Sequence, residues 1–265
     1  MFDVALSTMW AVGRFPELAD FFDAGRKLGF ARFELNHAIT SAMLEGLSLD
    51  GTITSVHEPC PADLSMNVLK ERNWLVSAPG EEDRRQGVAA IRRSIDLAHK
   101  LGVGAVIVHP GRVDIDTDLE SKLASLYRAG KAGRPEYARA KERLAAARAA
   151  QAETNMRSVR RSLVELAEYA ARMGVRLGLE NRFHYHEIPL PEELEDLLHR
   201  SAFVLESMIY GEPDEKHDEV IAAMIVPDAE AFIEYDHRQK LSQLGRAVAP
   251  QSGVSPFFPV QVIKM

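Results

Sequence analysis

The feature that most constrains the fold is the alternation of short apolar segments with longer amphipathic segments over the first 180 residues. The short segments predict buried strands, and the longer ones carry apolar residues at helical spacing. Glycine follows two of the predicted helices, at Gly29 and Gly102, where it can adopt the left-handed conformation that ends a helix. This order predicts a parallel sheet whose consecutive strands are joined by crossover helices.

Five strands and several helices are expected from this pattern. The strands are predicted at residues 2–6, 31–36, 53–57, 103–108 and 174–180. The helices are predicted at 16–28, 81–101 and 158–172, with a helical insertion over 112–153 that is broken near Gly130, Gly133 and Pro135. Five such strands fit an incomplete α/β TIM-barrel-like fold, and they also fit an open doubly wound sheet. No Gly-x-Gly-x-x-Gly follows the first strand, which weighs against a dinucleotide-binding fold.

Length, charge and cysteine content bound the class of protein. The 265 residues suffice for one large α/β barrel or two modest domains. The net charge of −7 argues against nucleic acid as a partner. The single cysteine, Cys60, excludes an internal disulfide and suits a reducing compartment, and we expect it to be inert. With no signal-peptide pattern and no apolar run of about 18 residues, we expect a cytoplasmic protein without a membrane partner.

Polar residues gather where the predicted strands end. The second strand delivers Glu34 and Asn36, the third ends at His57 and Glu58, the fourth leads to His109, and the fifth leads to Glu180, Asn181 and Arg182, with His184 and His186 shortly after. The carboxyl ends of parallel strands in a barrel converge on one mouth. Imidazole nitrogens and carboxylate oxygens are ligands of zinc, manganese and related ions, and a carboxylate beside a metal-polarised carbonyl can move a proton. The sequence therefore predicts a functional site containing His57, His109 and Glu180.

Several of these residues also have a structural interpretation. A single histidine at a strand end is more often a hydrogen-bonded structural residue than a ligand. Glu34 could pair with Arg32 or Arg182 instead of a substrate. His184 and His186 could contact substrate or lie in a solvent-exposed loop.

These strand ends resemble a known family. The matching segments are Phe33-Glu34-Leu35, Ser55-Val56-His57-Glu58-Pro59, Leu97-Ala98-His99-Lys100-Leu101-Gly102, Val106-Ile107-Val108-His109-Pro110-Gly111 and Leu179-Glu180-Asn181. On these segments, residues 1 to about 198 resemble the xylose-isomerase-like barrel superfamily, which holds sugar-phosphate isomerases and epimerases and the apurinic-site endonucleases. The resemblance implies a (β/α)₈ fold with a divalent metal, Mn, Zn or Mg, at its mouth.

The resemblance also implies roles for individual residues. Glu180 matches the strand-five glutamate that ligates metal in both branches, and it is the expected catalytic residue. His57 and His109 match histidines that bind zinc in the endonuclease branch. The residues expected to bind a sugar or sugar phosphate are Glu34, Asn36, Asn181, Arg182 and His184. The reaction expected from the sugar branch is proton transfer next to a carbonyl.

The chain departs from that family after the fifth strand. The family's strand-six Asp and nearby His, its strand-seven His and its strand-eight Glu have no recognisable counterparts. Residues 188–236 instead resemble the C-terminal domain of AMP-forming acyl-CoA synthetases, on the matching segments 191–195, 204–211 and 213–228. Physically, this stretch predicts a helix, a strand, a charged turn, a second strand and the start of a helix. We therefore expect a partial barrel over 1–198, a small α+β segment over 199–243 and a turn-rich, poorly ordered tail over 244–265.

Three functions compete at this point. The first is a divalent-metal-dependent sugar or sugar-phosphate isomerase or epimerase. The second is a zinc-dependent apurinic-site endonuclease, against which the acidic net charge argues. The third is a catalytically inactive fusion that only binds partners, which the missing late-barrel ligands favour. The exposed edges of an incomplete barrel would also favour association into a homo-oligomer.

Overall fold

The structure is a computed structural model that describes residues 2–49, 51–199, 204–214, 218–227 and 258–259. Its strands are β1 (Phe2–Ser7), β2 (Phe30–Leu35), β3 (Ile53–His57), β4 (Ala105–Val108), β5 (Arg176–Leu179), β6 (Val204–Asp214), β7 (Asp218–Pro227) and β8 (Phe258–Pro259). Its helices are η1 (Thr8–Ala11), α1 (Leu18–Lys27), α2 (Ser41–Leu44), α3 (Met66–Glu71), α4 (Glu81–Lys100), α5 (Asp118–Arg128), α6 (Pro135–Arg172) and α7 (Pro191–His199).

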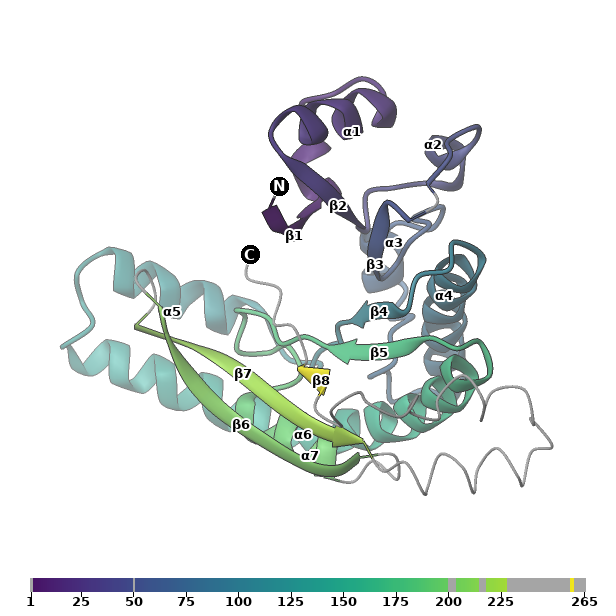
Figure 1. Ribbon diagram of the computed structural model, residues 1–265. Coiled ribbons are helices and arrows are strands. Elements are labelled where there is room, and N and C mark those ends of the chain that lie inside the picture. Colours follow the sequence, from purple (N-terminus) through teal and green to yellow (C-terminus); the bar gives the residue numbers. More distant parts are fainter. Residues whose placement is uncertain (1, 50, 200–203, 215–217, 228–257, 260–265) are drawn as a thin grey trace.

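The first five strands form one parallel sheet in the order β1-β2-β3-β4-β5 (Figure 1). This arrangement confirms the predicted fold class, an α/β TIM-barrel-like fold with five parallel strands in its sheet. The parallel order requires crossover connections, and α1, α4 and α6 pack along one side of the sheet (Figure 1). The carboxyl ends of all five strands consequently lie at the same edge of the sheet.

The main core fills the space between the sheet and these helices. Apolar side chains of the strands meet the apolar stripes of the helices there, as the period-two and helical patterns predict. The largest fully buried apolar side chains include Phe21, Phe33, Leu35, Val56, Ile95, Val106, Val108 and Leu166. Gly87 of α4 faces the backbone of the segment before that helix, and a Cβ built there would lie 2.4 Å from the carbonyl carbon of Leu75. A side chain at this position is therefore excluded by close packing.

One helix prediction is wrong in its boundaries. The break near Gly130, Gly133 and Pro135 is confirmed, because α5 ends at Arg128 and α6 begins at Pro135. However, no second break precedes Ser158, and α6 runs without interruption over 38 residues. Asn155, in the middle of α6, is buried and donates a hydrogen bond from its side chain to Ser77 O at 2.9 Å. A polar residue that is usually found at helix ends is here used for tertiary contact.

Two short helices were not predicted in the loops after β2 and β3. Thr40 caps α2 by accepting a hydrogen bond from Met43 N, and Ser65 caps α3 by accepting one from Val68 N. Both caps are of the type that stabilises a helix start. The loop after β3 therefore places Lys70, in α3, on a defined element rather than in an irregular polar segment.

The region after α7 forms a separate antiparallel pair of β6 and β7, with β8 pairing to β7. The predicted order of helix, strand and strand is confirmed here. The predicted charged turn between the two strands falls on residues 215–217, and these lie outside the described residues, as does the predicted helix start beyond β7. The same is true of the predicted tail over 244–265, apart from Phe258–Pro259.

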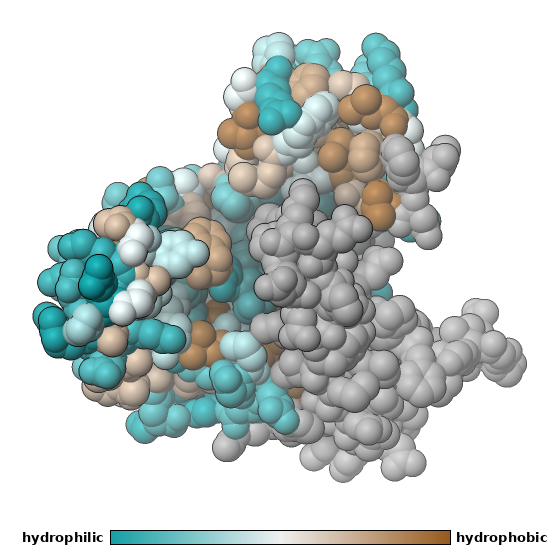
Figure 2. Space-filling model, turned by 90° about the vertical axis from the view of Figure 1, so that its left-hand side faces the viewer, coloured by the Kyte–Doolittle hydropathy of each residue, from teal (hydrophilic) through white to brown (hydrophobic). Residues whose placement is uncertain are grey.

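One part of the molecular surface carries several exposed hydrophobic residues. Figure 2 shows hydrophobic residues gathered on its upper part, which in Figure 1 is built from β1 to α2. Exposed large apolar side chains in this part are Val4, Met9, Val12, Leu28 and Met43. Within the ranges described by the structure, no helix combines the length and apolar character needed to cross a membrane.

Candidate metal centre

Three neighbouring strands bring His57, His109 and Glu180 to one edge of the sheet. His57 is the last residue of β3, His109 directly follows β4, and Glu180 directly follows β5. Backbone hydrogen bonds carry the ladder past the strand ends, from Glu58 N to Ile107 O and from Glu180 N to Val108 O, both at 3.0 Å. The backbone positions of the three side chains are therefore fixed by sheet pairing rather than by flexible loops.

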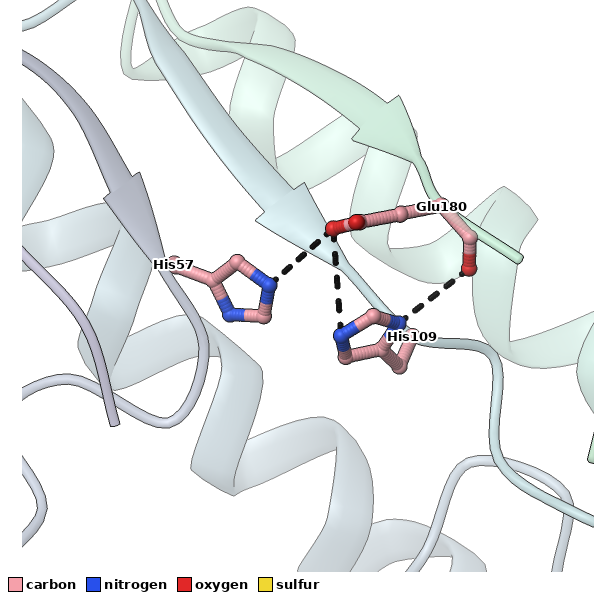
Figure 3. A group of neighbouring side chains, drawn as sticks. All are labelled: His57, His109 and Glu180. Carbon is pink, nitrogen blue, oxygen red and sulfur yellow. Dashed lines mark hydrogen bonds and ion pairs between the residues drawn. The ribbon is translucent and has the colours of Figure 1, made fainter. Parts of the chain in front are cut away.

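The three side chains point toward one another (Figure 3). His57 Nε2 lies 3.1 Å from Glu180 Oε2, and His109 Nε2 lies 3.8 Å from the same oxygen. One donor atom from each residue lies within 4.8 Å of the donor atoms of the other two. The side chains of His57 and His109 are 9% and 8% exposed, whereas that of Glu180 is 21% exposed. The cluster is therefore largely buried but reachable from the side of the carboxylate.

The outer nitrogen of each imidazole is held by a backbone carbonyl. His57 Nδ1 lies 3.1 Å from Glu58 O, and His109 Nδ1 lies 3.2 Å from Glu180 O. A carbonyl oxygen can only accept, so each Nδ1 carries the hydrogen and each Nε2 faces the centre. This is the outer-shell arrangement that orients histidine ligands in metal sites.

The electrostatics of the two histidines differ. Burial disfavours a charged imidazole at His57, but its hydrogen bond with Glu180 and the nearby charge of Glu58 outweigh burial and raise its pKa. At His109, burial and the neighbouring charge of His57 lower the pKa. For Glu180, burial opposes ionisation, but the hydrogen bond from His57 and the charges of both histidines lower the pKa. One proton is thus held between His57 and Glu180, and a cation bound at the centre would replace it.

Glu58 supports the backbone of one residue of the centre. Its carboxylate is buried and accepts a hydrogen bond from His109 N at 3.2 Å. Burial raises the pKa of Glu58, and the charge of His57 opposes that rise only in part. Glu58 therefore holds the backbone of His109 in place and does not add a second carboxylate to the cluster.

A pocket adjoins His109 and is lined by three cationic side chains. Lys70, Arg112 and Arg182 line it together with Glu58 and Glu187. Glu187 is 5% exposed and lies 3.3 Å from Arg182 Nε and 3.8 Å from Lys70 Nζ. Its Oε2 atom is buried without a hydrogen-bond partner among the described residues. The pocket therefore offers both cationic groups and an unused acceptor.

The second strand contributes less to the centre. Glu34 accepts a hydrogen bond from Ser55 Oγ at 2.9 Å and is buried. Asn36 Oδ1 accepts from Ala38 N at 2.8 Å, and its Nδ2 is a buried donor without a partner in the described part of the chain. The ring of His37 lies beside that of His57, with 5.9 Å between their centroids. Asn36 thus has a spare donor, whereas Glu34 is already engaged.

The remaining predicted site residues separate into two places. Arg182 lines the cationic pocket, and Asn181 is half-buried next to Glu180. His184 does not join the His57 cluster in this structure, because it contacts Glu120 of α5 together with His186. Three residues near these sites were not predicted from the sequence, namely Glu120, Lys70 and Arg112. Only Arg112 carried a usable signal, since it directly follows the strand-end segment His109-Pro110-Gly111.

Comparison with known proteins adds the family. The family model described as "Xylose isomerase-like TIM barrel" matches residues 23–201, which is more than half of the chain. The chain belongs to the xylose isomerase-like TIM barrel family. The family match confirms the predicted resemblance to this family. None of the curated proteins compared with the chain matches its sequence.

Solved structures similar to this xylose isomerase-like chain include an epimerase-like protein and an epimerase. A D-tagatose 3-epimerase-like protein is 17% identical over 74% of this chain and 60% of its own length, with a TM-score of 0.46. The 3-keto-D-glucoside 4-epimerase from E. coli is 15% identical over 75% of this chain and 64% of its own length, with a TM-score of 0.47. The chain thus spans less than two thirds of the length of either structure.

The second resemblance has no such support. The xylose isomerase-like match ends at residue 201, and the comparisons do not support a likeness of residues 188–236 to acyl-CoA synthetases. The helix and the two strands that the segment predicted are nevertheless present, because a helix followed by a hairpin is common to many folds. Secondary structure alone therefore did not identify a family here.

The residues of the xylose isomerase-like centre fit a divalent cation. Two inward-facing imidazole nitrogens and one carboxylate form a ligand set that Zn²⁺ uses, and a fourth position then remains for water or substrate. Mn²⁺ accepts the same ligand types with a greater preference for oxygen. Each histidine already has the outer hydrogen bond that such a ligand needs.

Proposed function

We propose that this chain is a divalent-metal-dependent sugar or sugar-phosphate isomerase or epimerase that moves a proton at a carbon next to a carbonyl. The observation that carries the proposal is the cluster of His57, His109 and Glu180 at the ends of three adjacent parallel strands. Membership of the xylose isomerase-like family agrees with it.

His57, His109 and Glu180 would hold the metal, which when bound supplies a Lewis acid that polarises the substrate carbonyl. Glu180 is the most exposed of the three, and its pKa is lowered, so it is an ionised acceptor for a proton from the adjacent carbon. Asn36, whose Nδ2 has no partner among the described residues, and the half-buried Asn181 would orient substrate hydroxyls. Glu58 keeps His109 in position through its backbone.

The pocket beside the centre favours an anionic substrate. Lys70, Arg112 and Arg182 bring three positive charges, opposed by the carboxylates of Glu58 and Glu187. A planar guanidinium binds phosphate oxygens in pairs, and a lysine adds a point charge. A sugar phosphate is therefore the favoured substrate class, with its phosphate in this pocket and its carbonyl at the centre.

Metal binding and turnover test this proposal together. We expect Mn²⁺ or Zn²⁺ at about 100 times its dissociation constant to stabilise the chain by about 2.7 kcal/mol, which corresponds to a rise of about 5–10 °C in melting temperature. Glu180→Gln should bind one equivalent less and lose isomerisation of sugar phosphates. Glu153→Gln, on the exposed side of α6, is the matched control and should behave like the parent chain. Equal metal content and equal stabilisation in Glu180→Gln would contradict the proposal.

The anionic pocket has a separate test. Replacing Arg112 by Met should raise the KM for a sugar phosphate by about 10–100-fold, because a charge-assisted hydrogen bond contributes about 1.5–3 kcal/mol. The KM for the corresponding free sugar should change little. Arg72→Met is the control, since Arg72 stacks on Trp74 and does not line the pocket. A uniform loss with both substrates would assign Arg112 a structural role instead.

Phosphodiester cleavage at abasic DNA is a second candidate, because two histidines and one carboxylate are a zinc-type ligand set. The net charge of −7 opposes it, since DNA binding gains its affinity from cationic contacts with phosphates. Zinc-dependent cleavage of an abasic duplex at low salt that disappears in Glu180→Gln would favour this candidate. Turnover of sugar phosphates without cleavage would eliminate it.

A further inference from the structure

A second cluster of potential ligands lies outside the centre described above. It consists of Glu120 in the first turn of α5 and of His184 and His186 in the loop after β5. His184 Nδ1 lies 3.0 Å from Glu120 Oε1, and His186 Nδ1 lies 2.6 Å from Glu120 Oε2. One donor atom from each of the three residues lies within 4.8 Å of the others. The two oxygens of one carboxylate thus face two imidazole nitrogens.

The backbone around this cluster is fixed independently of the histidine rings. Glu120 Oε1 also accepts a hydrogen bond from Tyr185 N at 3.1 Å, and His186 O accepts one from Val113 N at 2.7 Å. Arg148 of α6 donates to Tyr185 O at 2.7 Å. The loop is therefore held from both sides, so the rings converge on Glu120 without needing a ligand to order them.

The spacing of the two histidines suits ligation. One residue separates them, their ring centroids are 5.2 Å apart and their planes differ by 33°, so both rings lie on one side of the loop. The side chain of His186 is 12% exposed and that of His184 is 42% exposed. The cluster therefore combines a sheltered side with one open to solvent, as a site with a water ligand requires.

We propose that Glu120, His184 and His186 form a second divalent-cation site, of the zinc type, with its remaining position open to water. Two imidazoles and a carboxylate are ligands that Zn²⁺ accepts, whereas Ca²⁺ and Mg²⁺ prefer sites made of oxygens alone. The bound ion would fasten α5 to the loop that also carries Arg182 and Glu187 to the cationic pocket. This site shares no ligand with the centre of His57, His109 and Glu180, and it does not depend on the proposed function.

The competing explanation is a direct clamp, in which Glu120 only pairs with the two histidines. Zinc titration by calorimetry, with zinc content measured after gel filtration, separates the two. The parent chain should bind two equivalents of Zn²⁺, Glu120→Gln should bind one, and Glu120→Gln combined with Glu180→Gln should bind none. Glu120→Gln keeps the shape and the acceptor for Tyr185 N, so it leaves the loop anchored.

A more exposed substitution guards against misfolding. His184→Gln changes a side chain that is 42% exposed, and we expect it to weaken the second equivalent at least tenfold while the melting temperature in EDTA stays within about 2 °C of the parent. Zinc binding unchanged in both Glu120→Gln and His184→Gln would overturn the proposal, as would a parent chain whose zinc is lost entirely in Glu180→Gln. If the parent chain binds a single equivalent of Zn²⁺, and Glu180→Gln keeps it while Glu120→Gln loses it, the second site is supported and the first is removed.

Discussion

Arg148 is the residue whose loss should disturb the site loop most without touching any proposed ligand. It lies in α6 with only 5% of its side chain exposed, and both terminal nitrogens donate to the carboxylate of Glu193 in α7 at 2.7 Å. Its Nε donates to Tyr185 O at 2.7 Å, and its Nη2 also donates to Glu187 O at 3.2 Å. One side chain thus joins α6, α7 and the loop after β5.

Replacing Arg148 by Met removes the cation but keeps most of the side-chain volume. The change strands a carboxylate that is 17% exposed and two carbonyl oxygens. Removing one partner of a buried ion pair costs about 3–5 kcal/mol, and for a chain of this size about 10 °C of melting temperature. Thermal unfolding followed by circular dichroism measures this loss directly.

A matched arginine on the same helix provides the control. Arg160 also links α6 to α7, through Asp196 at 2.8 Å, but it is 28% exposed and its partner is 27% exposed. Its replacement by Met should therefore cost no more than about 1 kcal/mol. Adding Glu193→Gln to Arg148→Met should restore part of the stability, because no unpaired charge then remains. If Arg148→Met destabilises no more than Arg160→Met, the assignment of Arg148 as a buried junction is refuted.

Three further predictions concern the core. Gly87→Ala should lower the free energy of unfolding by about 1–3 kcal/mol in urea denaturation, because the added methyl group would meet backbone atoms. Gly133→Ala, whose added methyl group would have no atom within 4 Å, should change the same free energy by less than about 0.5 kcal/mol. Equal effects of the two substitutions would refute the packing argument. Thr8→Val should cost about 1–3 kcal/mol in the same assay, because it removes the buried acceptor of Asn36 N, and an unchanged midpoint would contradict this. Burial raises the pKa of Cys60 to about 12, so the thiol should react with a disulfide reagent at pH 8 only after unfolding. Rapid reaction of the folded chain would show that solvent reaches the Cys60 thiol.

The sequence predicted that His57, His109 and Glu180 lie together, because that signal is topological. Once five parallel strands are recognised, their carboxyl ends must share an edge, and His57, His109 and Glu180 stand directly at three of those ends. Their mutual distances then follow from strand spacing. The same reasoning placed Glu34 and Asn36 near the edge, but it could not foresee that Ser55 engages Glu34.

Residues on helices and in long loops could not be placed this way. Glu120 is one of many charged residues in a segment rich in Ala, Arg, Lys and Glu, and its partner His184 lies 64 residues further along the chain. No helix was predicted around Lys70, because the six-residue helix that carries it is too short to show periodicity. Ser158 looked like a helix start, yet it lies inside α6, where tertiary packing decides.

The boundary between 1–198 and 199–243 stays a prediction, as do the cytoplasmic location and the homo-oligomer.

The order in which the chain leaves the ribosome determines when His57, His109 and Glu180 can come together. His57 precedes Glu180 by 123 residues and His109 precedes it by 71, and sheet pairing brings them together only after β5 has joined β4. A nascent chain that has not yet released residue 180 therefore lacks the carboxylate of the proposed ligand set. Binding of the proposed cation would wait for nearly the whole parallel sheet, so such an ion would not nucleate the folding of the strands that hold it.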